Sequence, residues 1–280
     1  MTTVAVVGLG RMGGPMAGHI LAAGFPTAVF DVSPVALDAY ATSRARIATS
    51  PADAGTDAAV ACVVVFDDEQ AISVVAGAGG LLSTMPSGSV IAIHSTVSAG
   101  TIRSLHAHGI DRGIDVLDAG ISGGETGAAA GTLVTMVGGS ASAVEIARPV
   151  FSAFSKEVIH AGDLGSGLAL KLARNATGYV CMSAVHEALQ IAVAAGVDPD
   201  VLRHTLAETG VFDQALSPFM LGGPAPLPDD AAESMRELLT HLRALGEKDL
   251  DQALDLAGEL RQTVPVIEAT RRSFHSVTRL

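Results

Sequence analysis

The 280-residue chain has a formal net charge of −12 and no arginine-rich run, so we do not expect nucleic acid or anionic membranes as partners. Its length allows one large or two ordinary domains, and no apolar run reaches the length of a membrane span. The histidines lack metal-ligand spacing, so we expect no metal site. Cys62 and Cys181 are isolated and no leader-like segment precedes the first strand, so we expect a cytoplasmic protein.

The N-terminal segment has the pattern of a dinucleotide-binding unit. A β-branched apolar run over residues 3–7 predicts a buried strand, and a GxGxxG sequence follows it at once. A helical run and a second strand over residues 27–31 come next, and this strand ends in Asp31. A strand, the glycine sequence, a helix, a strand and an acidic residue in this order indicate a nucleotide site.

Each glycine of this segment has a physical role. Gly8 permits the tight turn, Gly10 lets the backbone approach a pyrophosphate, and Gly13 lets the helix pack on the strand. Asp31 should accept hydrogen bonds from the adenosine ribose hydroxyls and repel a 2′-phosphate, which predicts NAD in preference to NADP. The cofactor contacts expected in the loop are Gly8, Leu9, Gly10, Arg11, Met12 and Gly13.

Strands and helices continue to alternate up to about residue 160. This alternation predicts an α/β fold with a Rossmann-type, doubly wound parallel sheet, whose ligands bind outside the carboxyl ends of the strands. The glycine-rich loop at residues 119–124 could present consecutive N–H groups to a carboxylate, or could be an ordinary loop entering the next strand. The predicted strands cover residues 59–66, 89–94, 116–119, 133–137 and 158–160, and the helices cover 69–76, 99–108 and 142–154.

Residues 165–196 predict one long helix that begins at a glycine pair, with Ser166 as a possible N-cap, and ends at Gly196. The helix is apolar almost all round, so it should be buried or lie at a subunit contact. Lys171 and Asn175 are spaced i, i+4 and therefore share one face. A buried ammonium needs a partner, and a substrate or cofactor would be one; the alternative is a lysine that extends to solvent.

After the long helix the pattern becomes helical throughout. Helices are predicted at residues 199–207, 231–245, 248–261 and 266–277, with a proline-rich loop at 217–230. We therefore expect an NAD-binding Rossmann domain over residues 1–163 and an all-helical substrate and oligomerisation domain over 164–280, joined by the long helix.

Four ordered motifs resemble those of the β-hydroxyacid dehydrogenases, of which 3-hydroxyisobutyrate dehydrogenase is the best known, and together they span nearly the whole chain. The first is the glycine segment from Gly8 to Ala17, and the second runs from Asp118 to Gly124 and on through residues 127–139. The third is the Gly165-x-Gly167 pair followed by Lys171 and Asn175, and the fourth is Lys248-Asp249-Leu250.

The resemblance implies NAD-dependent oxidation of a small 3-hydroxy acid to its semialdehyde, or the reverse reduction. Lys171 would be the general acid/base, and Ser122, Gly123, Gly124 and Asn175 would hold a carboxylate-bearing substrate; Lys171, Asn175 and Ser122 form the expected catalytic set. The cofactor contacts would extend to Val65, Phe66, Ser95, Thr96 and Lys248, with Thr96 beside the nicotinamide and ribose. The resemblance also implies a homodimer or homotetramer.

The chain departs from the family pattern close to the expected substrate site. Arg174 replaces a second asparagine, and Ile93-His94 stands where an aspartate usually precedes Ser-Thr. His241 stands where an aromatic residue is common, and the 217–230 segment matches no family feature. These positions bear on the identity of the substrate.

Imine reductases, 6-phosphogluconate dehydrogenases and non-catalytic NAD-binding proteins are the alternatives. Imine reductases usually lack the lysine and prefer NADP, which Lys171 and Asp31 argue against. The 6-phosphogluconate enzymes are longer and have a histidine at the position of Leu168. A pure NAD sensor would need only the nucleotide site, and would not need Lys171, Asn175 and Ser122 together.

Overall fold

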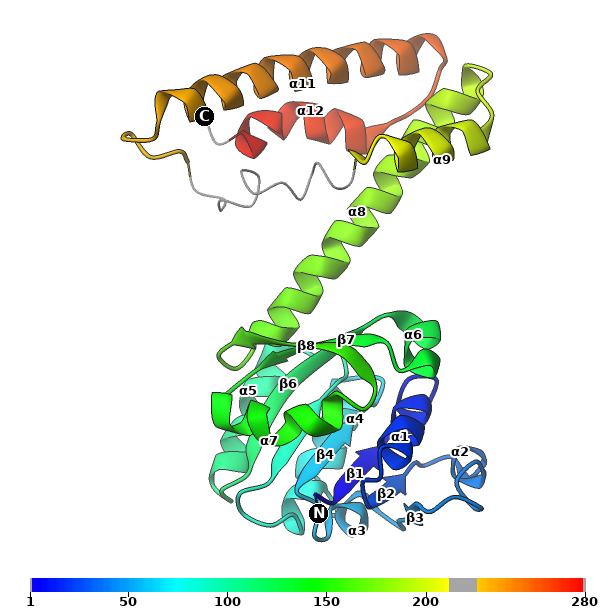
Figure 1. The fold of residues 1–280 in the computed structure, drawn as a ribbon, viewed down its shortest axis with the longest axis vertical. Helices are drawn as coiled ribbons and strands as arrows, with labels where there is room; N and C mark the ends of the chain where they lie inside the picture. The colour runs from blue at the N-terminus through cyan, green and yellow to red at the C-terminus, as the bar shows by residue number, and fades with distance from the viewer. Residues whose placement is uncertain (1, 212–225, 279–280) are drawn as a thin grey trace. The chain divides into compact units, whose positions relative to one another are not determined.

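The computed structural model describes residues 2–211 and 226–278, and the chain divides into two compact units, Met1–Asn175 and Ala176–Leu280. The division falls inside one long helix, α8 (Ser166–Ala194). The domain limits expected from the sequence, 1–163 and 164–280, stay a prediction. The two divisions differ by the opening turns of α8, which pack on the sheet of the first unit (Figure 1).

Strands and helices alternate along the first unit, as the sequence predicts. The strands are β1 (Val4–Val7), β2 (Thr27–Phe30), β3 (Arg46–Ile47), β4 (Val60–Val63), β5 (Val90–Ile93), β6 (Asp115–Ser122), β7 (Leu133–Gly138) and β8 (Ser155–Gly162). The helices before α8 are α1 (Gly13–Ala22), α2 (Pro34–Asp38), α3 (Pro51–Gly55), α4 (Asp68–Ala76), the 3₁₀ turn η1 (Leu81–Ser83), α5 (Ala99–Ile110), α6 (Gly124–Ala130) and α7 (Ala141–Phe151).

The strands form one eight-stranded sheet in the order β3-β2-β1-β4-β5-β6-β7-β8. Strands β1 to β6 are parallel, β7 is antiparallel to β6, and β8 is parallel to β7. The predicted Rossmann-type fold is confirmed, with the last two strands running opposite to the other six.

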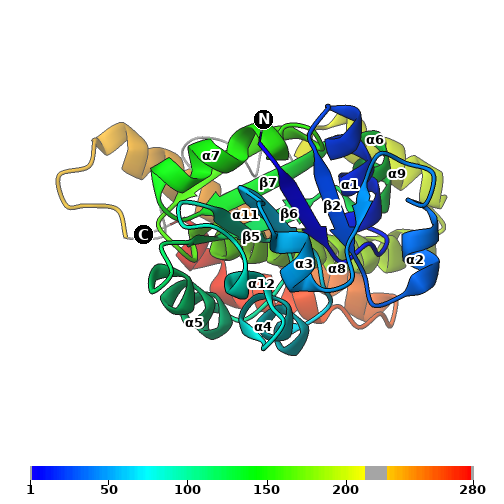
Figure 2. The same ribbon diagram turned by 90° about the horizontal axis from the view of Figure 1, so that it is seen from below.

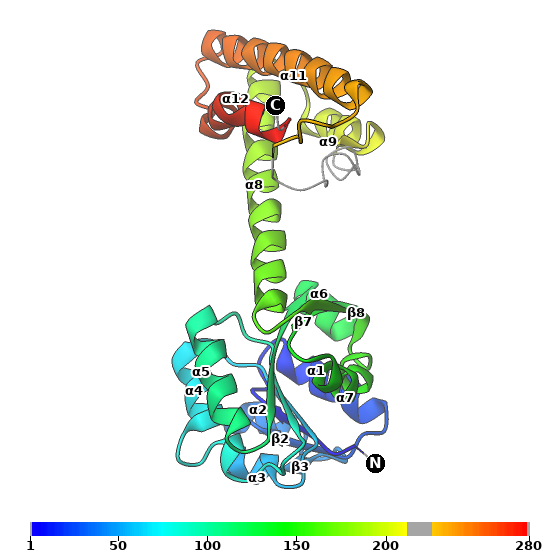
Figure 3. The same cartoon turned by 90° about the vertical axis from the view of Figure 1, so that its left-hand side faces the viewer.

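Helices cover both faces of this sheet (Figures 2 and 3). Val4 and Val6 of β1 pack in the cluster that includes α1 and α7. Ala5 and Val7 of the same strand pack with α3, α4 and α5 on the opposite face. Because successive side chains of a strand point to opposite faces, a continuous apolar run such as Val4–Val7 is buried on both sides.

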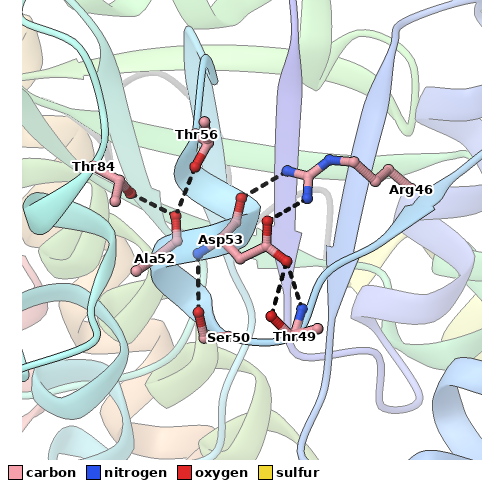
Figure 4. A network of polar contacts seen from close by, with 7 residues as sticks. All are labelled: Arg46, Thr49, Ser50, Ala52, Asp53, Thr56 and Thr84. Atoms are coloured by element: carbon pink, nitrogen blue, oxygen red, sulfur yellow. Dashed lines mark hydrogen bonds and ion pairs between the residues drawn. The ribbon is translucent and has the colours of Figure 1, made fainter.

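The sequence patterns did not predict β3 and α3, two short elements that side-chain hydrogen bonds stabilise. At the β3 edge, Asp53 accepts hydrogen bonds from Arg46 Nη1 at 2.6 Å and from the Thr49 amide at 2.7 Å (Figure 4). These hydrogen bonds, with that of Thr49 first, hold the pKa of the Asp53 carboxyl below its usual range. The Ser50 hydroxyl caps α3 by accepting from the Asp53 amide.

The first turn of α8 lies directly on the backbone of β6 and β7. A Cβ at Gly167 would lie 2.5 Å from the Met136 carbonyl oxygen, and a Cβ at Gly138 would lie 2.8 Å from the Gly167 nitrogen. Only glycine leaves room for this approach. Ser166 is the first helical residue, so the expectation that it caps the helix is wrong; the buried Asp118 of β6 instead accepts from the Gly165 and Leu168 amides at 2.7 and 2.6 Å.

The second unit is helical in its described part, as predicted. It contains the C-terminal half of α8, α9 (Pro199–Glu208), α11 (Glu233–Glu259) and α12 (Pro265–Val277). The buried Glu187 of α8 caps α12 by accepting from the Val266 and Ile267 amides at 2.7 and 2.9 Å. Residues 217–225 of the predicted proline-rich loop lie outside the described residues.

The prediction of two helices over residues 231–245 and 248–261 is wrong, because α11 is continuous through Gly246. A Cβ at Gly246 would lie 2.3 Å from the Phe274 ring, so the glycine allows α12 to pack closely on α11 (Figure 1). Close packing against Phe274 therefore explains why a glycine, which in the sequence suggests the end of a helix, stands inside α11. No helix in the described ranges combines the length and hydropathy needed to cross a bilayer.

Substituting Asp118→Ala should lower the free energy of unfolding of the first unit by about 2–3 kcal/mol, because two amides at the start of α8, one of them buried, would lose their carboxylate acceptor. Urea denaturation followed by circular dichroism measures this. The matched control is Asp163→Ala, which removes an exposed carboxylate next to the same helix end and should cost less than about 1 kcal/mol. Equal midpoints for the two variants would contradict the capping role.

Candidate active site

A cavity of about 760 Å³ opens where β1, β2 and β4 end, at the carboxyl edge of the sheet. Ligands of open α/β sheets bind at this edge. The glycine loop after β1 forms one wall, and the first turns of α4 form another. The cavity is lined by Val7, Gly8, Gly10, Arg11, Met12, Gly13, Phe30, Asp31, Val32, Val64, Val65, Phe66, Asp67, Glu69, Gln70, Ser73 and Val74.

The glycine loop has the geometry that a bound pyrophosphate requires. Gly8 has φ +92°, and a Cβ there would lie 2.1 Å from the Val64 carbonyl oxygen. A Cβ at Gly13 would lie 2.0 Å from the Gly8 carbonyl oxygen, so α1 can start only with glycine at this point. At Gly10 no atom lies within 4 Å of the Cβ position, which leaves the space in the cavity open. The loop therefore fits a dinucleotide.

Asp31 follows β2 and lies in the cavity wall. Its carboxylate accepts from the Leu9 amide at 2.6 Å and from the Ser33 amide at 2.8 Å. It therefore also orders the glycine loop, a contact that the sequence did not predict. The next residue, Val32, is 90% exposed, and no arginine stands beside Asp31 in the chain.

The structure brings most of the expected cofactor residues together, but not all of them. Val65 and Phe66 line the cavity, whereas Leu9, Ser95 and Thr96 are not among its lining residues. The Ser95 hydroxyl accepts from the Val65 amide at 2.8 Å, and Thr96 is exposed. Lys248 lies on α11 in the second unit, where its amine is 3.2 Å from Asp249, and its contact with the cofactor stays a prediction.

Helix α4 supplies lining residues that sequence reasoning missed. Glu69, Gln70, Ser73 and Val74 face the cavity, and the Gln70 amide oxygen accepts from the Phe66 N–H at 3.1 Å. The available signal was the position of α4 directly after β4, because the helix that follows a strand of a doubly wound sheet begins at the ligand edge.

Lys171 of α8 lies against the end of β6. A Cβ at Gly120 would lie 2.7 Å from Lys171 Cδ, so the lysine stem packs on the strand backbone at a residue without a side chain. Lys171 Nζ donates to the Ile121 carbonyl at 2.9 Å, which places the amine at the peptide that joins Ile121 to Ser122. Burial, and then the charge of Arg174, lower the pKa of the half-buried Lys171 amine.

Ser122, Gly123 and Gly124 join β6 to α6, a helix that the sequence did not predict because its glycines weaken the helical pattern. Gly123 and Gly124 have φ values of +134° and +63°, and at Gly124 no atom lies within 4 Å of the Cβ position. Two exposed contacts join α6 to α1 and its loop: an Arg11–Glu125 ion pair of 3.0 Å and a 3.0 Å contact between His19 Nε2 and the Ala129 carbonyl. The loop after β6 is thereby attached to the glycine loop after β1.

Asn175 lies one helical turn after Lys171, as its spacing predicts. Its amide oxygen accepts from Arg174 Nη1 at 3.3 Å. Arg174 is exposed and has no ion pair within residues 2–211 and 226–278.

Comparison with known proteins shows to which family this chain is similar. Residues 3–162 match the family described as the NAD binding domain of 6-phosphogluconate dehydrogenase. The chain is 34% identical to the NAD-dependent L-serine dehydrogenase of Pseudomonas aeruginosa over 95% of this chain and 89% of that protein. It is 32% identical to the 3-hydroxyisobutyrate dehydrogenase of the same organism, over 98% of this chain and 91% of the relative.

Among solved structures, a putative oxidoreductase from Mycobacterium avium 104 superposes with a TM-score of 0.86 and 32% identity, covering 100% of this chain and 99% of the other. The matched family covers more than half of the chain, and the relatives match it over nearly its whole length. The chain belongs to the β-hydroxyacid dehydrogenase family of NAD(P)-dependent oxidoreductases.

Proposed function

We propose that this protein oxidises a small 3-hydroxy acid of the 3-hydroxyisobutyrate class to its semialdehyde with NAD, or catalyses the reverse reduction. The observation that supports this most is the position of Lys171, whose half-buried amine lies at the Ile121–Ser122 peptide with a lowered pKa. A bound nicotinamide supplies the hydride acceptor. The protein must then take the hydroxyl proton, and a neutral lysine amine is a suitable base.

In this proposal the loop after β6 holds the carboxylate. The positive φ values at Gly123 and Gly124 turn the backbone, and the open space at Gly124 leaves room for a ligand next to Ser122. Asn175 contributes its amide from the same helix face as Lys171. We also propose that Thr96 lies beside the nicotinamide and that Lys248 contacts the cofactor.

Two other functions remain as alternatives, an imine reductase-like activity and a non-catalytic NAD-binding role. Oxidation of an alcohol requires a group that removes the hydroxyl proton, and Lys171 meets this requirement in position and in the direction of its pKa shift. NADH formation on a panel of short 3-hydroxy acids, with cyclic imines in the reductive direction, separates the three functions.

The choice of cofactor is a separate proposal that depends on Asp31. Its carboxylate lies in the cavity wall with no arginine next to it in the chain, so it should repel a 2′-phosphate. We expect kcat/KM to be higher with NAD than with NADP. Equal or better kcat/KM with NADP would contradict this.

Replacing Lys171→Ala should lower kcat by about 10²–10⁴-fold, the usual contribution of a general acid/base. NADH affinity, measured by fluorescence titration, should change little because Lys171 is not among the lining residues of the nucleotide cavity. Lys171→Arg should not restore the rate, since a guanidinium does not deprotonate in the useful range. Loss of NADH binding in parallel with kcat would instead make Lys171 a cofactor-holding residue.

The same role fixes the pH dependence of oxidation. The neutral amine is the active form, so kcat/KM should rise with pH through the lowered pKa of Lys171. Arg174 is a cause of that lowering, and Arg174→Asn should therefore move the rising limb to higher pH. If the rising limb of the pH profile stays at the same pH in Arg174→Asn, the titration of a group other than Lys171 controls the rate.

We also propose a homo-oligomer whose contact includes α8. Tyr179, Val180 and Met182 on this helix are 67%, 59% and 68% exposed, which is unusual for apolar side chains so close together. A second copy of the chain would cover them. Light scattering at micromolar concentration should give a dimer or tetramer, and a monomer would refute the proposal.

A further inference from the structure

Strand β6 continues past the end of its neighbour β5 and leaves one edge without a strand partner. The last β5–β6 pair is Ile93 with Asp118, whereas β6 runs on to Ser122. The Asp115 amide donates to the Ser89 carbonyl, so residues 115, 117, 119 and 121 direct their backbone groups toward the β5 side. The carbonyls of Ala119 and Ile121 therefore lie beyond the last residue of β5.

Two side chains replace the missing strand at these carbonyls. His94, the residue after β5, donates from Nδ1 to the Ala119 carbonyl at 2.7 Å. Lys171 donates from Nζ to the next carbonyl on the same edge, that of Ile121, at 2.9 Å. Between them lies Gly120, against which the Lys171 stem packs. A displacement of the Ala119 peptide would therefore also move the acceptor of the Lys171 amine.

His94 is buried against two aromatic rings. It is 2% exposed, and the rings of Phe151 and Phe154 contact it edge-on, with centroid distances of 5.3 and 5.6 Å. Burial, the largest cause, lowers the pKa of His94 to about 4, so the ring stays neutral near pH 7 with its proton on Nδ1. Its Nε2 has no hydrogen-bond partner among the described residues.

We propose that His94 is a positioning residue for Lys171: by holding the Ala119 carbonyl, it fixes the free edge of β6 and so places the Ile121 carbonyl that receives the lysine amine. This inference depends on the proposed general acid/base role of Lys171. His94 itself touches neither cofactor nor substrate in the proposal. Among the described residues, the titratable or charged groups on the segments next to Lys171 include His94 after β5, Asp118 on β6 and Arg174 on α8.

The test compares two substitutions that differ in the hydrogen bond. His94→Asn keeps an N–H donor at the position of Nδ1, whereas His94→Leu keeps an apolar side chain of similar size and has no donor. We expect kcat to fall about 10-fold or more in His94→Leu and to stay within about 3-fold in His94→Asn, since small misplacements of a reacting group are costly. NADH affinity should be unchanged in both.

A pH profile distinguishes positioning from a general loss of stability. A carbonyl that accepts from Lys171 favours the ammonium form, so losing this contact should lower the pKa of the amine further. The rising limb of kcat/KM should then move to lower pH in His94→Leu and stay in place in His94→Asn. Equal kcat and equal limbs in the two variants, or a fall in NADH affinity that parallels kcat, would overturn the inference.

Should His94→Leu fail to fold, Phe151→Leu removes one ring contact and leaves both hydrogen-bonding groups in place. A fall in kcat of about 3-fold or more at unchanged NADH affinity supports positioning, and an unchanged kcat overturns it. The unsubstituted protein and Lys171→Ala are the references. If the unsubstituted protein is inactive on 3-hydroxy acids, or if Lys171→Ala retains its kcat, the proposed function itself fails, whatever the His94 variants do.

Discussion

The close approach of α8 to the backbone of β6 and β7 is the constraint on which the proposed catalytic site depends. Gly138 and Gly167 make the approach possible because each would otherwise place a Cβ against a main-chain atom. Asp118 supplies the compensating polar contact by accepting from two amides at the helix start. With the helix fixed at this point, Lys171 lies over Gly120 and its amine lies at the Ile121 carbonyl.

The two candidate binding regions of the first unit are linked by side-chain contacts. Asp31 orders the glycine loop by accepting from the Leu9 amide, and Arg11 from that loop pairs with Glu125 of α6. Helix α6 begins at Gly124, the last residue of the Ser122–Gly124 segment. The exposed Arg11–Glu125 pair contributes little stability by itself, since surface ion pairs are worth about 0–1 kcal/mol. Its consequence is geometric, because it joins the loop proposed for the substrate to the loop of the nucleotide cavity.

Local pattern was sufficient to predict seven of the eight strands, the glycine loop and the spacing of Lys171 and Asn175, but not β3 or the antiparallel direction of β7. The structural contacts that pattern missed join distant parts of the chain. Asp118 caps a helix that starts about fifty residues later. Gly246 has the sequence pattern of a helix end, but it lies within a helix where the Phe274 ring leaves no room for a side chain. The β5 strand ends before β6 does, so the bond from His94 to Ala119 depends on sheet register, which no single segment encodes.

The role of Lys171 is the central claim, and chemical rescue of Lys171→Ala by small primary amines tests it most directly. If the lysine amine transfers the proton, added amines that fit the vacated space should restore oxidation of the 3-hydroxy acid in proportion to their concentration. Among amines of similar size, the restored rate should rise with the pKa of the amine, as general base catalysis requires. A variant that no amine rescues while its NADH affinity is intact, or one that needs no rescue because kcat has not fallen, would contradict the claim.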